Sequence, residues 1–154
     1  MAQIGELAPA LSLPDADMEL VELSALRGKK VVLFFYLRDD TPGCTIEATD
    51  FTDLESEFAR AECVVLGISR DDVFSHAEFR DKHGISVRLL SDPDCEACER
   101  YQVMQDREVD GQHKRGVVRS TFIIDRDGVI RHIYPCVQPR GHAQDVLRYV
   151  KMMN

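Results

Sequence analysis

The strongest constraint on the fold is the run of seven apolar residues at positions 31–37, Val-Val-Leu-Phe-Phe-Tyr-Leu. Its β-branched and aromatic side chains are typical of a strand that is covered on both faces. A dense turn signal, Asp-Asp-Thr-Pro-Gly at positions 39–43, follows this run. Beyond the turn, apolar side chains recur at helical spacing: Phe51, Leu54 and Phe58. The pattern predicts a buried strand that leads through a tight turn into a helix from near Cys44 to about Arg60.

Similar patterns alternate along the rest of the chain. We expect, in order, one or two short strands within 11–23, a strand at 63–69, a helix at 73–83 that Gly84 ends, a strand at 87–90, a short helix at 95–101, an antiparallel hairpin of 120–124 and 129–134 with Gly128 in its turn, and a last amphipathic helix around 146–150. Strands that alternate with helices and finish in a hairpin predict an α/β domain with a mixed central sheet, helices on either side of it and an N-terminal β extension.

The length and the charge of the chain limit its organisation and its partners. A chain of 154 residues suits a single domain, 1–154, with one core. Its formal net charge of -8 disfavours nucleic acid and anionic membrane surfaces as partners. The apolar run at 31–37 is too short to cross a bilayer, and the first residues lack the pattern of a secretion signal. We therefore expect a cytoplasmic protein.

Cysteine is the residue type that points to chemistry. The chain has five cysteines, an odd number at irregular spacing, which does not suit a secreted disulfide scaffold. In a reducing compartment such cysteines are packing residues, metal ligands or redox catalysts, and their positions decide which. Cys63, which begins a predicted buried strand, is expected to be a packing residue.

Cys44 has the position of a reactive cysteine. It lies in the first turn of the predicted helix, where unpaired backbone N–H groups and the helix dipole stabilise a thiolate. Thr41, three residues earlier, can offer a hydroxyl to the sulfur or to a bound substrate. The alternatives are a cysteine that only packs at a crowded helix start, and disulfide exchange, which would need a second cysteine where the chain has Thr41.

Several segments of the chain resemble the peroxiredoxin family, specifically the subfamily of the bacterioferritin comigratory protein, or peroxiredoxin Q. The resemblance rests on the Thr-Pro-Gly-Cys-Thr motif at 41–45, and on the segments 27–36, 66–69, 90–92 and 119–125, the last reading Arg-Ser-Thr-Phe-Ile-Ile-Asp. It implies a thioredoxin fold and a thiol peroxidase that reduces hydrogen peroxide or organic hydroperoxides without a cofactor or a metal. Cys44 would be the peroxidatic cysteine, assisted by Thr41 and by an active-site arginine, Arg119.

One position departs from the family pattern. Leu37 stands seven residues before Cys44, where relatives have a proline. Leucine can shield the sulfur, but it does not fix the backbone φ or remove an N–H group, so the approach to the pocket is expected to differ from that of relatives.

The resemblance leaves the resolving thiol open. Attack on a peroxide makes a sulfenic acid at Cys44, which another thiol must reduce. The family's usual resolving positions carry no cysteine here, which leaves Cys136, Cys98 and Cys95 as candidates, or direct reduction by an external thiol. The expected reductant is thioredoxin, glutaredoxin or a low-molecular-weight thiol, and the expected state is a monomer.

Two other functions stay open from the residues alone. Cys95 and Cys98, with two histidines, could form a zinc site, but no pair of histidines has the spacing that would complete it. A thioredoxin-like scaffold could also serve as a binding module without catalysis, although the combination of Thr41, Cys44 and Arg119 argues against this.

Overall fold

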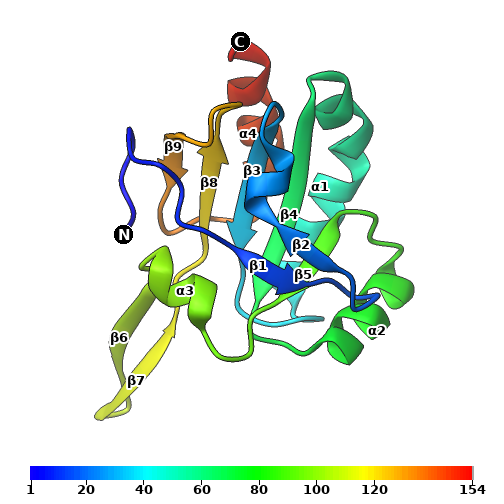
Figure 1. The fold of residues 1–154 in the computed structure, drawn as a ribbon. Coiled ribbons are helices and arrows are strands. Elements are labelled where there is room, and N and C mark those ends of the chain that lie inside the picture. The colour runs from blue at the N-terminus through cyan, green and yellow to red at the C-terminus, as the bar shows by residue number, and fades with distance from the viewer. Residues whose placement is uncertain (154) are drawn as a thin grey trace.

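A five-stranded mixed sheet forms the centre of the molecule in the computed structural model (Figure 1). The structure describes residues 1–153, and at positions 107 and 109 it describes the backbone only. The strand order is β5-β4-β3-β8-β9, with β3 in the middle. Strands β3 and β4 and strands β4 and β5 pair in parallel, whereas β8 pairs antiparallel with both β3 and β9. Their bounds are β3 Lys30–Phe35, β4 Cys63–Ser69, β5 Arg88–Ser91, β8 Ser120–Ile124 and β9 Ile130–Tyr134. The predicted α/β class with a mixed sheet is confirmed.

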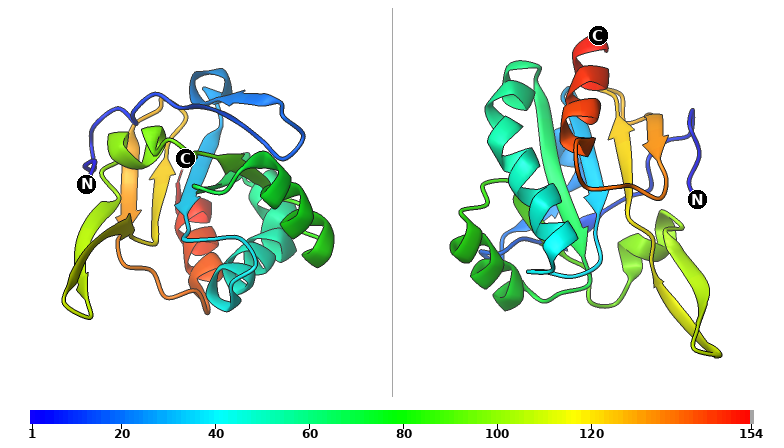
Figure 2. Two further views of the ribbon diagram at one scale, coloured as in Figure 1. Left: turned by 90° about the horizontal axis from the view of Figure 1, so that it is seen from below. Right: turned by 180° about the vertical axis from the view of Figure 1, so that it is seen from behind.

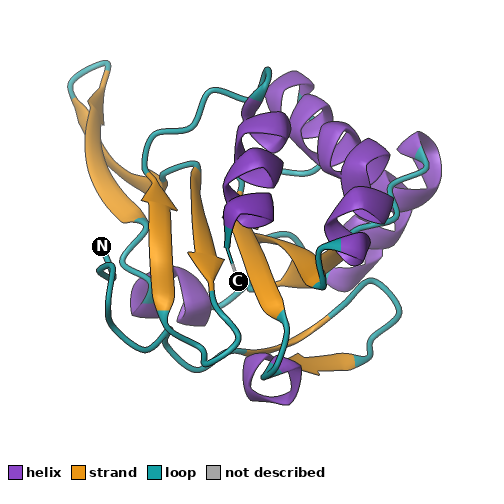
Figure 3. Ribbon diagram, turned by 90° about the horizontal axis from the view of Figure 1, so that it is seen from above, coloured by secondary structure: helices purple, strands orange, loops and turns teal. Residues whose placement is uncertain are grey.

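One face of the sheet is covered by helices α1 (Pro42–Arg60), α2 (Val73–His83) and α4 (His142–Met152). Helices α1 and α4 lie side by side across it (Figures 2 and 3). Phe34 of β3 stacks on Phe51 of α1 with ring centroids 4.7 Å apart, and Gly67 of β4 lies beneath the Phe34 ring. All six residues of β3 are buried, as the unbroken apolar run predicts.

The opposite face is covered mainly by the N-terminal extension. The extension consists of the antiparallel pair β1 (Ser12–Pro14) and β2 (Leu20–Glu22) and the 3-10 helix η1 (Leu23–Leu26). The short helix α3 (Glu96–Arg100) packs on the same face. The prediction of a sheet flanked by helices, with an N-terminal β extension, is therefore confirmed: the long helices share one face, and the other face carries the extension and the five-residue helix α3.

The helix ends follow the sequence signals. Asp72 caps α2 by accepting a hydrogen bond from Ser75 N at 2.8 Å, and Gly84 ends the helix with a φ of 64°, in the left-handed region that glycine tolerates. Gly128 takes a φ of 83° in the turn between β8 and β9, where the sequence predicts a tight glycine turn. Among residues 1–153, none of the helices combines the length and the apolar character that a membrane crossing needs.

A second hairpin has no counterpart in the sequence expectations. Strands β6 (Met104–Val109) and β7 (Gln112–Val117) pair antiparallel and project from the body of the molecule beside α3 (Figure 1). Asp110 and Gly111 join them with φ values of 54° and 77°, the backbone of a type I′ turn. Asp-Gly is a strong hairpin signal, but the flanking strands lack the alternation of apolar and polar residues that would identify them.

Candidate active site

Cys44 lies in the first turn of α1, beyond the carboxyl end of β3. Thr41 is the N-cap and Pro42 the first helical residue, and the first backbone hydrogen bond runs from Thr45 N to Thr41 O at 2.8 Å. The N–H groups of Gly43 and Cys44 therefore have no acceptor within the helix. The cysteine is only 1% exposed. The predicted position is confirmed: a thiol at a helix N-terminus, shielded from bulk water.

Arg119 contacts the sulfur directly. It lies between β7 and β8, and its Nη2 atom donates to Cys44 Sγ at 3.3 Å. The side chain is 12% exposed. Burial lowers the pKa of Arg119, but the negative charges of Glu47 and Cys44 outweigh burial and raise it above its ordinary value. A guanidinium that stays charged beside the sulfur stabilises the thiolate.

Glu47 completes the contact, although it was not among the site residues predicted from the sequence. Its Oε1 atom accepts from Arg119 Nη1 at 3.0 Å, and no described residue bonds its Oε2 atom. The residue is 1% exposed, and this burial raises the pKa of Glu47 to about 7, although Arg119 opposes the shift. The available signal was its position three residues after Cys44, on the helix face that also carries buried Ala48 and Phe51.

The hydroxyl of Thr41 does not form a hydrogen bond with the sulfur. Thr41 Oγ1 donates instead to the carbonyl oxygen of Arg38 at 3.1 Å. Because the hydroxyl hydrogen is engaged there, the lone pairs of Oγ1 remain available to accept from a ligand. The structure thus brings Cys44 and Arg119 into contact and places Thr41 at the edge of the same site.

The loop between β3 and α1 is held by a buried network. Asp39 accepts from the Tyr36 hydroxyl at 2.6 Å and from the Ser75 hydroxyl at 2.8 Å, and its Oδ2 lies 2.7 Å from His76 Nδ1. His76 Nε2 lies 2.9 Å from Leu90 O, which can only accept, so Nε2 carries a hydrogen. The network ties the loop before Cys44 to α2 and β5.

This network also contains the one set of described residues that could ligate a metal ion. Ligand atoms of Asp39, Asp71 and His76 lie within 4.8 Å of one another. They already bond one another or neighbouring groups: Asp71 Oδ2, for example, accepts from Asp39 N at 2.9 Å. Within residues 1–153, Cys95 and Cys98 belong to no such set, so the zinc interpretation gains no support.

His142 lies close to the site from the side of α4. Its Nε2 is 2.8 Å from Thr121 Oγ1 in β8, and its ring packs against Phe51 and Tyr134. Burial, with the charge of Arg119, lowers the pKa of His142 to about 4, although Asp145 opposes the shift. The imidazole is therefore neutral near pH 7.

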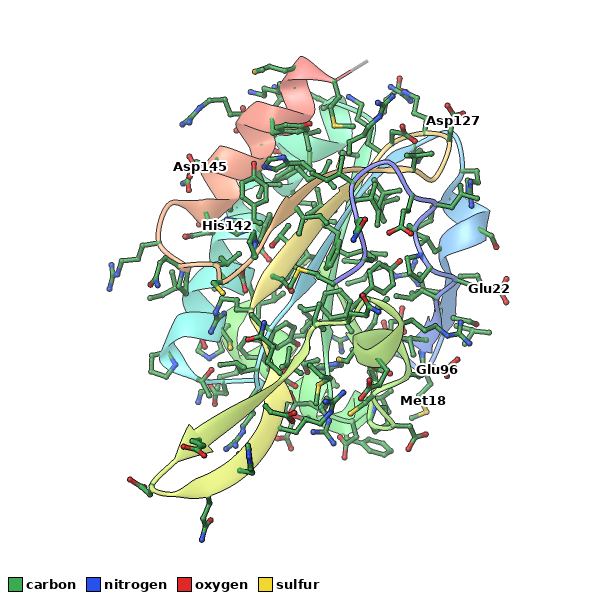
Figure 4. All side chains as sticks on the ribbon, turned by 90° about the vertical axis from the view of Figure 1, so that its left-hand side faces the viewer. Met18, Glu22, Glu96, Asp127, His142 and Asp145 are labelled. Atoms are coloured by element: carbon green, nitrogen blue, oxygen red, sulfur yellow. The ribbon has the colours of Figure 1, made fainter. Side chains whose placement is uncertain are left out.

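The candidate resolving cysteines lie in different places. Cys136 is exposed, in the loop after β9, and its neighbour Val137 donates from N to Arg119 O at 2.8 Å. Cys98 is fully buried and Cys95 partly buried in the core on the α3 face, whereas Cys44 packs in the core on the α1 and α4 face. Figure 4 shows these two sides of the molecule, with Glu96 of α3 on one and His142 of α4 on the other.

Burial makes three of the other thiols poor nucleophiles. It raises the pKa of Cys98 and, to a smaller extent, that of Cys95. It also raises the pKa of Cys63, which packs at the start of β4, to about 12. A thiol that stays protonated does not attack a sulfenic acid.

A groove of about 760 Å³ lies beside the N-terminus of α1, next to Cys44. Thr41, Gly43 and Arg119 line it near Cys44, and the other lining residues come from the loops after β3 and β4 and from β7. A shielded thiol with an arginine on its sulfur, beside an open groove, suits nucleophilic attack on a small substrate.

Comparison with known proteins agrees with this geometry. Residues 4–133 match the model of the AhpC/TSA family. Peroxiredoxin Bcp of Bacillus subtilis is 37% identical over 152 residues, which cover 99% of this chain and 97% of that protein. A structure of the Xanthomonas campestris bacterioferritin comigratory protein, determined for insight into its alkyl peroxide reduction activity, superposes with a TM-score of 0.89 at 36% identity, covering 92% of this chain and 90% of that one. A PrxQ mutant from Xylella fastidiosa gives a TM-score of 0.92 at 32% identity, covering 98% and 96%.

Proposed function

We propose that Cys44 is the peroxidatic cysteine of this chain and that Arg119 and Thr41 assist it. The premise is that the chain belongs to the AhpC/TSA family and is a thiol peroxidase with the thioredoxin fold of the peroxiredoxins. The observation that carries the proposal is the hydrogen bond of 3.3 Å from Arg119 Nη2 to the buried Sγ of Cys44. The same guanidinium can reach both the attacking sulfur and a peroxide beside it.

The chemical step transfers one oxygen atom. The Cys44 thiolate attacks the distal oxygen of the peroxide, so that an S–O bond forms as the O–O bond breaks. The sulfur is oxidised to a sulfenic acid, and the leaving oxygen takes the bonding pair and a proton to become an alcohol, or water from hydrogen peroxide. Negative charge moves from sulfur to the leaving oxygen, and the charged Arg119 stabilises it throughout.

Thr41 has a role in orienting the peroxide. Its hydroxyl hydrogen points to Arg38 O, so its oxygen can accept the O–H of a hydroperoxide that enters the groove. The free N–H groups of Gly43 and Cys44 provide further donors at the helix start.

For the second step we favour Cys136 among the internal thiols. It is exposed, and the loop that carries it runs past the site: a Cβ placed on Gly43 would lie 3.4 Å from Pro139 Cγ. A disulfide needs Cα atoms within about 7 Å, so the first turn of α1 would unwind to bring Cys44 to this loop. Cys95 and Cys98 are disfavoured because they pack in the core on the α3 face.

The reductant and the setting of the enzyme complete the proposal. Thioredoxin, glutaredoxin or a low-molecular-weight thiol would reduce the exposed disulfide or, if no internal thiol reacts, the sulfenic acid itself. We place this reaction in the reducing cytoplasm, in a one-domain monomer of residues 1–154, and light scattering tests the monomer.

Oxidation with an equimolar amount of hydrogen peroxide, followed by mass spectrometry of every cysteine, tests the proposal. We expect Cys44 to be modified first and Cys44→Ser to abolish peroxide turnover. The pairing of Cys44 then identifies the resolving thiol, or a lone sulfenic acid identifies a one-cysteine cycle. Unmodified Cys44, or turnover by Cys44→Ser, would refute the assignment of the nucleophile.

A further inference from the structure

The proposed function leaves one cysteine pair unused, in the Cys-Glu-Ala-Cys segment at 95–98. Cys95 is the N-cap of α3 and Cys98 lies in its first turn, on the face of the sheet opposite Cys44. Glu99 N donates to Cys95 O at 2.9 Å, so the backbone between the two cysteines forms a closed helical turn. Side chains three residues apart on such a turn have Cβ atoms about 5–6 Å apart, and a disulfide needs Cα atoms within about 7 Å. The two thiols can therefore join by a small adjustment at the N-cap, without unwinding of α3.

The two thiols differ in their access to solvent. Cys98 is fully buried, whereas Cys95 is partly exposed at the edge of the same core. Burial raises the pKa of Cys95, Arg70 opposes this shift, and the nearby charges of Asp92 and Glu99 add to it. A reagent from solution can thus reach Cys95 directly, whereas Cys98 can react with a sulfur that Cys95 already holds.

A buried carboxylate lies beside the buried thiol. Asp92 is 1% exposed, and its two oxygens accept from Ala97 N at 3.2 Å and from Cys98 N at 2.9 Å. Burial, and after it the negative charge of Asp92, raises the pKa of the Cys98 thiol. Each carboxylate oxygen has two lone pairs, so an oxygen that accepts one N–H can still accept a thiol proton. Asp92 is therefore placed to take the proton that Cys98 must lose when it forms a disulfide.

The surroundings of this pair favour a disulfide over a peroxide as the oxidant. Arg119 bonds the Cys44 sulfur, whereas no arginine hydrogen bond in the described part of the chain reaches the sulfur of Cys95 or Cys98. The pair thus lacks the cation that stabilises charge on a leaving peroxide oxygen. Thiol–disulfide exchange needs less help, because its leaving group is a thiolate.

We propose that Cys95 and Cys98 form a second redox-active site, which exchanges with small-molecule disulfides and acts independently of Cys44. The Cys95 sulfur attacks one sulfur of the small disulfide, so that a mixed disulfide forms and one thiolate leaves. Cys98 then gives its proton to Asp92 and attacks the Cys95 sulfur, which closes the Cys95–Cys98 disulfide and releases the second thiolate. The two released thiolates take up the two protons that the cysteines lose. The protein is oxidised by two electrons, and the small disulfide is reduced to two thiols.

The test uses 2-hydroxyethyl disulfide as the oxidant, with acid quenching, alkylation and mass spectrometry of the cysteine peptides. The Cys95–Cys98 disulfide should form at the same rate in Cys44→Ser as in the unmodified chain. Cys98→Ser, or Cys98→Ala if serine disturbs the core, should hold the probe as a mixed disulfide on Cys95, and Cys95→Ser should form neither product. Cys63→Ser, which removes the buried thiol at the start of β4, is the control and should close the disulfide normally.

Asp92→Asn tests the proton acceptor. It should leave capture of the probe by Cys95 nearly unchanged and slow the closing step at least about tenfold, so that the mixed disulfide accumulates. Asp72→Asn is the matched control, because Asp72 also caps a helix, by accepting from Ser75 N at 2.8 Å, and it should change neither step. Loss of the Asp92 charge by itself would lower the pKa of Cys98 and speed closure, so faster closure in Asp92→Asn would refute this role.

The outcomes separate this inference from the assignment of Cys44. If excess probe produces no Cys95–Cys98 disulfide in the unmodified chain, the second site is wrong and the peroxidase assignment is untouched. If the disulfide forms in the unmodified chain but not in Cys44→Ser, the pair only receives oxidising equivalents from Cys44, and its independence is refuted. Equal formation in both proteins supports the second site, even if Cys44 proves not to be the peroxidatic cysteine.

Discussion

Arg119 joins Cys44 to Glu47: its Nη2 atom lies 3.3 Å from the Cys44 sulfur and its Nη1 atom lies 3.0 Å from Glu47 Oε1. One guanidinium thus bridges a buried thiol and a buried carboxyl group from the same helix. Residues 44 and 47 share a face of α1, and Arg119 reaches them from between β7 and β8. The contact fixes the orientation of the arginine at the sulfur.

Arg119→Lys should slow the oxidation of Cys44 by hydrogen peroxide by a factor of about 10²–10³. Lysine keeps the charge but lacks the planar fork that reaches the sulfur and Glu47 together. Single-turnover oxidation measures the effect. Arg131→Lys is the matched control, because Arg131 pairs with a carboxylate, Asp125, at 2.7 Å away from the site. An Arg119→Lys enzyme as fast as the unmodified one would show that the fork is not needed.

Glu47→Gln should flatten the fall in stability between pH 4.5 and 7. The pKa of Glu47 is raised from 4.5 to about 7 in the folded state, so between these pH values the folded state holds a proton that the unfolded state has already lost. The free energy of unfolding therefore falls as pH rises through this window. The loss amounts to at most about 3 kcal/mol. Urea unfolding at several pH values measures it. If Glu47→Gln and the unmodified protein keep parallel profiles, Glu47 does not titrate there.

His142→Gln should act in the opposite pH direction. The pKa of His142 is lowered from 6.5 to about 4, so the unfolded state binds the proton first and stability falls as pH drops from 6.5 to 4. The loss of stability also reaches at most about 3 kcal/mol. Glutamine does not titrate in this range but can still form a hydrogen bond with Thr121, so His142→Gln should remove this pH dependence. Urea unfolding between these pH values tests the change. If His142→Gln and the unmodified protein lose stability equally as pH falls, the prediction is wrong.

Cys136→Ser should make Cys44 easier to over-oxidise. Without a resolving thiol the sulfenic acid persists, and excess hydrogen peroxide converts it to sulfinic acid. Mass spectrometry after equal peroxide exposure should show more sulfinic Cys44 in Cys136→Ser than in the unmodified protein. Cys98→Ser, which changes a thiol buried on the α3 face, is the control. The opposite pattern would identify Cys98 as the resolving residue.

Gly67→Ala should destabilise the fold by about 1–3 kcal/mol. A Cβ at residue 67 would lie 2.6 Å from Phe34 Cζ and 3.1 Å from Leu89 Cδ2. The Phe34 ring cannot withdraw freely because it stacks on Phe51. Thermal unfolding checks the value, with Gly116→Ala as control, since a Cβ there would meet no atom within 4 Å. Equal melting temperatures would mean that the core adapts.

Local patterns were sufficient for most of the fold. The buried strand β3, the helix that begins near Cys44 and the glycine turn at 128 depend on side-chain periodicity and on backbone preferences of neighbouring residues, and all were predicted, although β3 ends at Phe35 and Leu37 is exposed. The hairpin of β6 and β7 was missed because its strands are mostly polar and pack little against the core. Its Asp110-Gly111 turn was the only local signal.

The residues of the candidate site could be predicted only in part, for the same reason. Cys44 and Thr41 lie within one turn and its helix, so local sequence was enough to propose them. Arg119 needed a family resemblance, because it lies 75 residues from Cys44 along the chain. Glu47 was visible as an acidic residue on an apolar helix face, but its meaning depends on the arginine that packs against it.

The sequence by itself determined the order of the strands of the central sheet and of the α-helices around it, and it placed a cysteine at a helix N-terminus, because these features depend on residues close together in the chain. Only the tertiary structure decided what surrounds that cysteine. It brought Arg119 to the sulfur, put Cys95 and Cys98 in the core on the other side of the sheet, and gathered Arg38, Arg70 and Lys114 around one groove. These relationships join segments far apart in the chain, and their charges and burial exist only once the strands have paired and the core has closed.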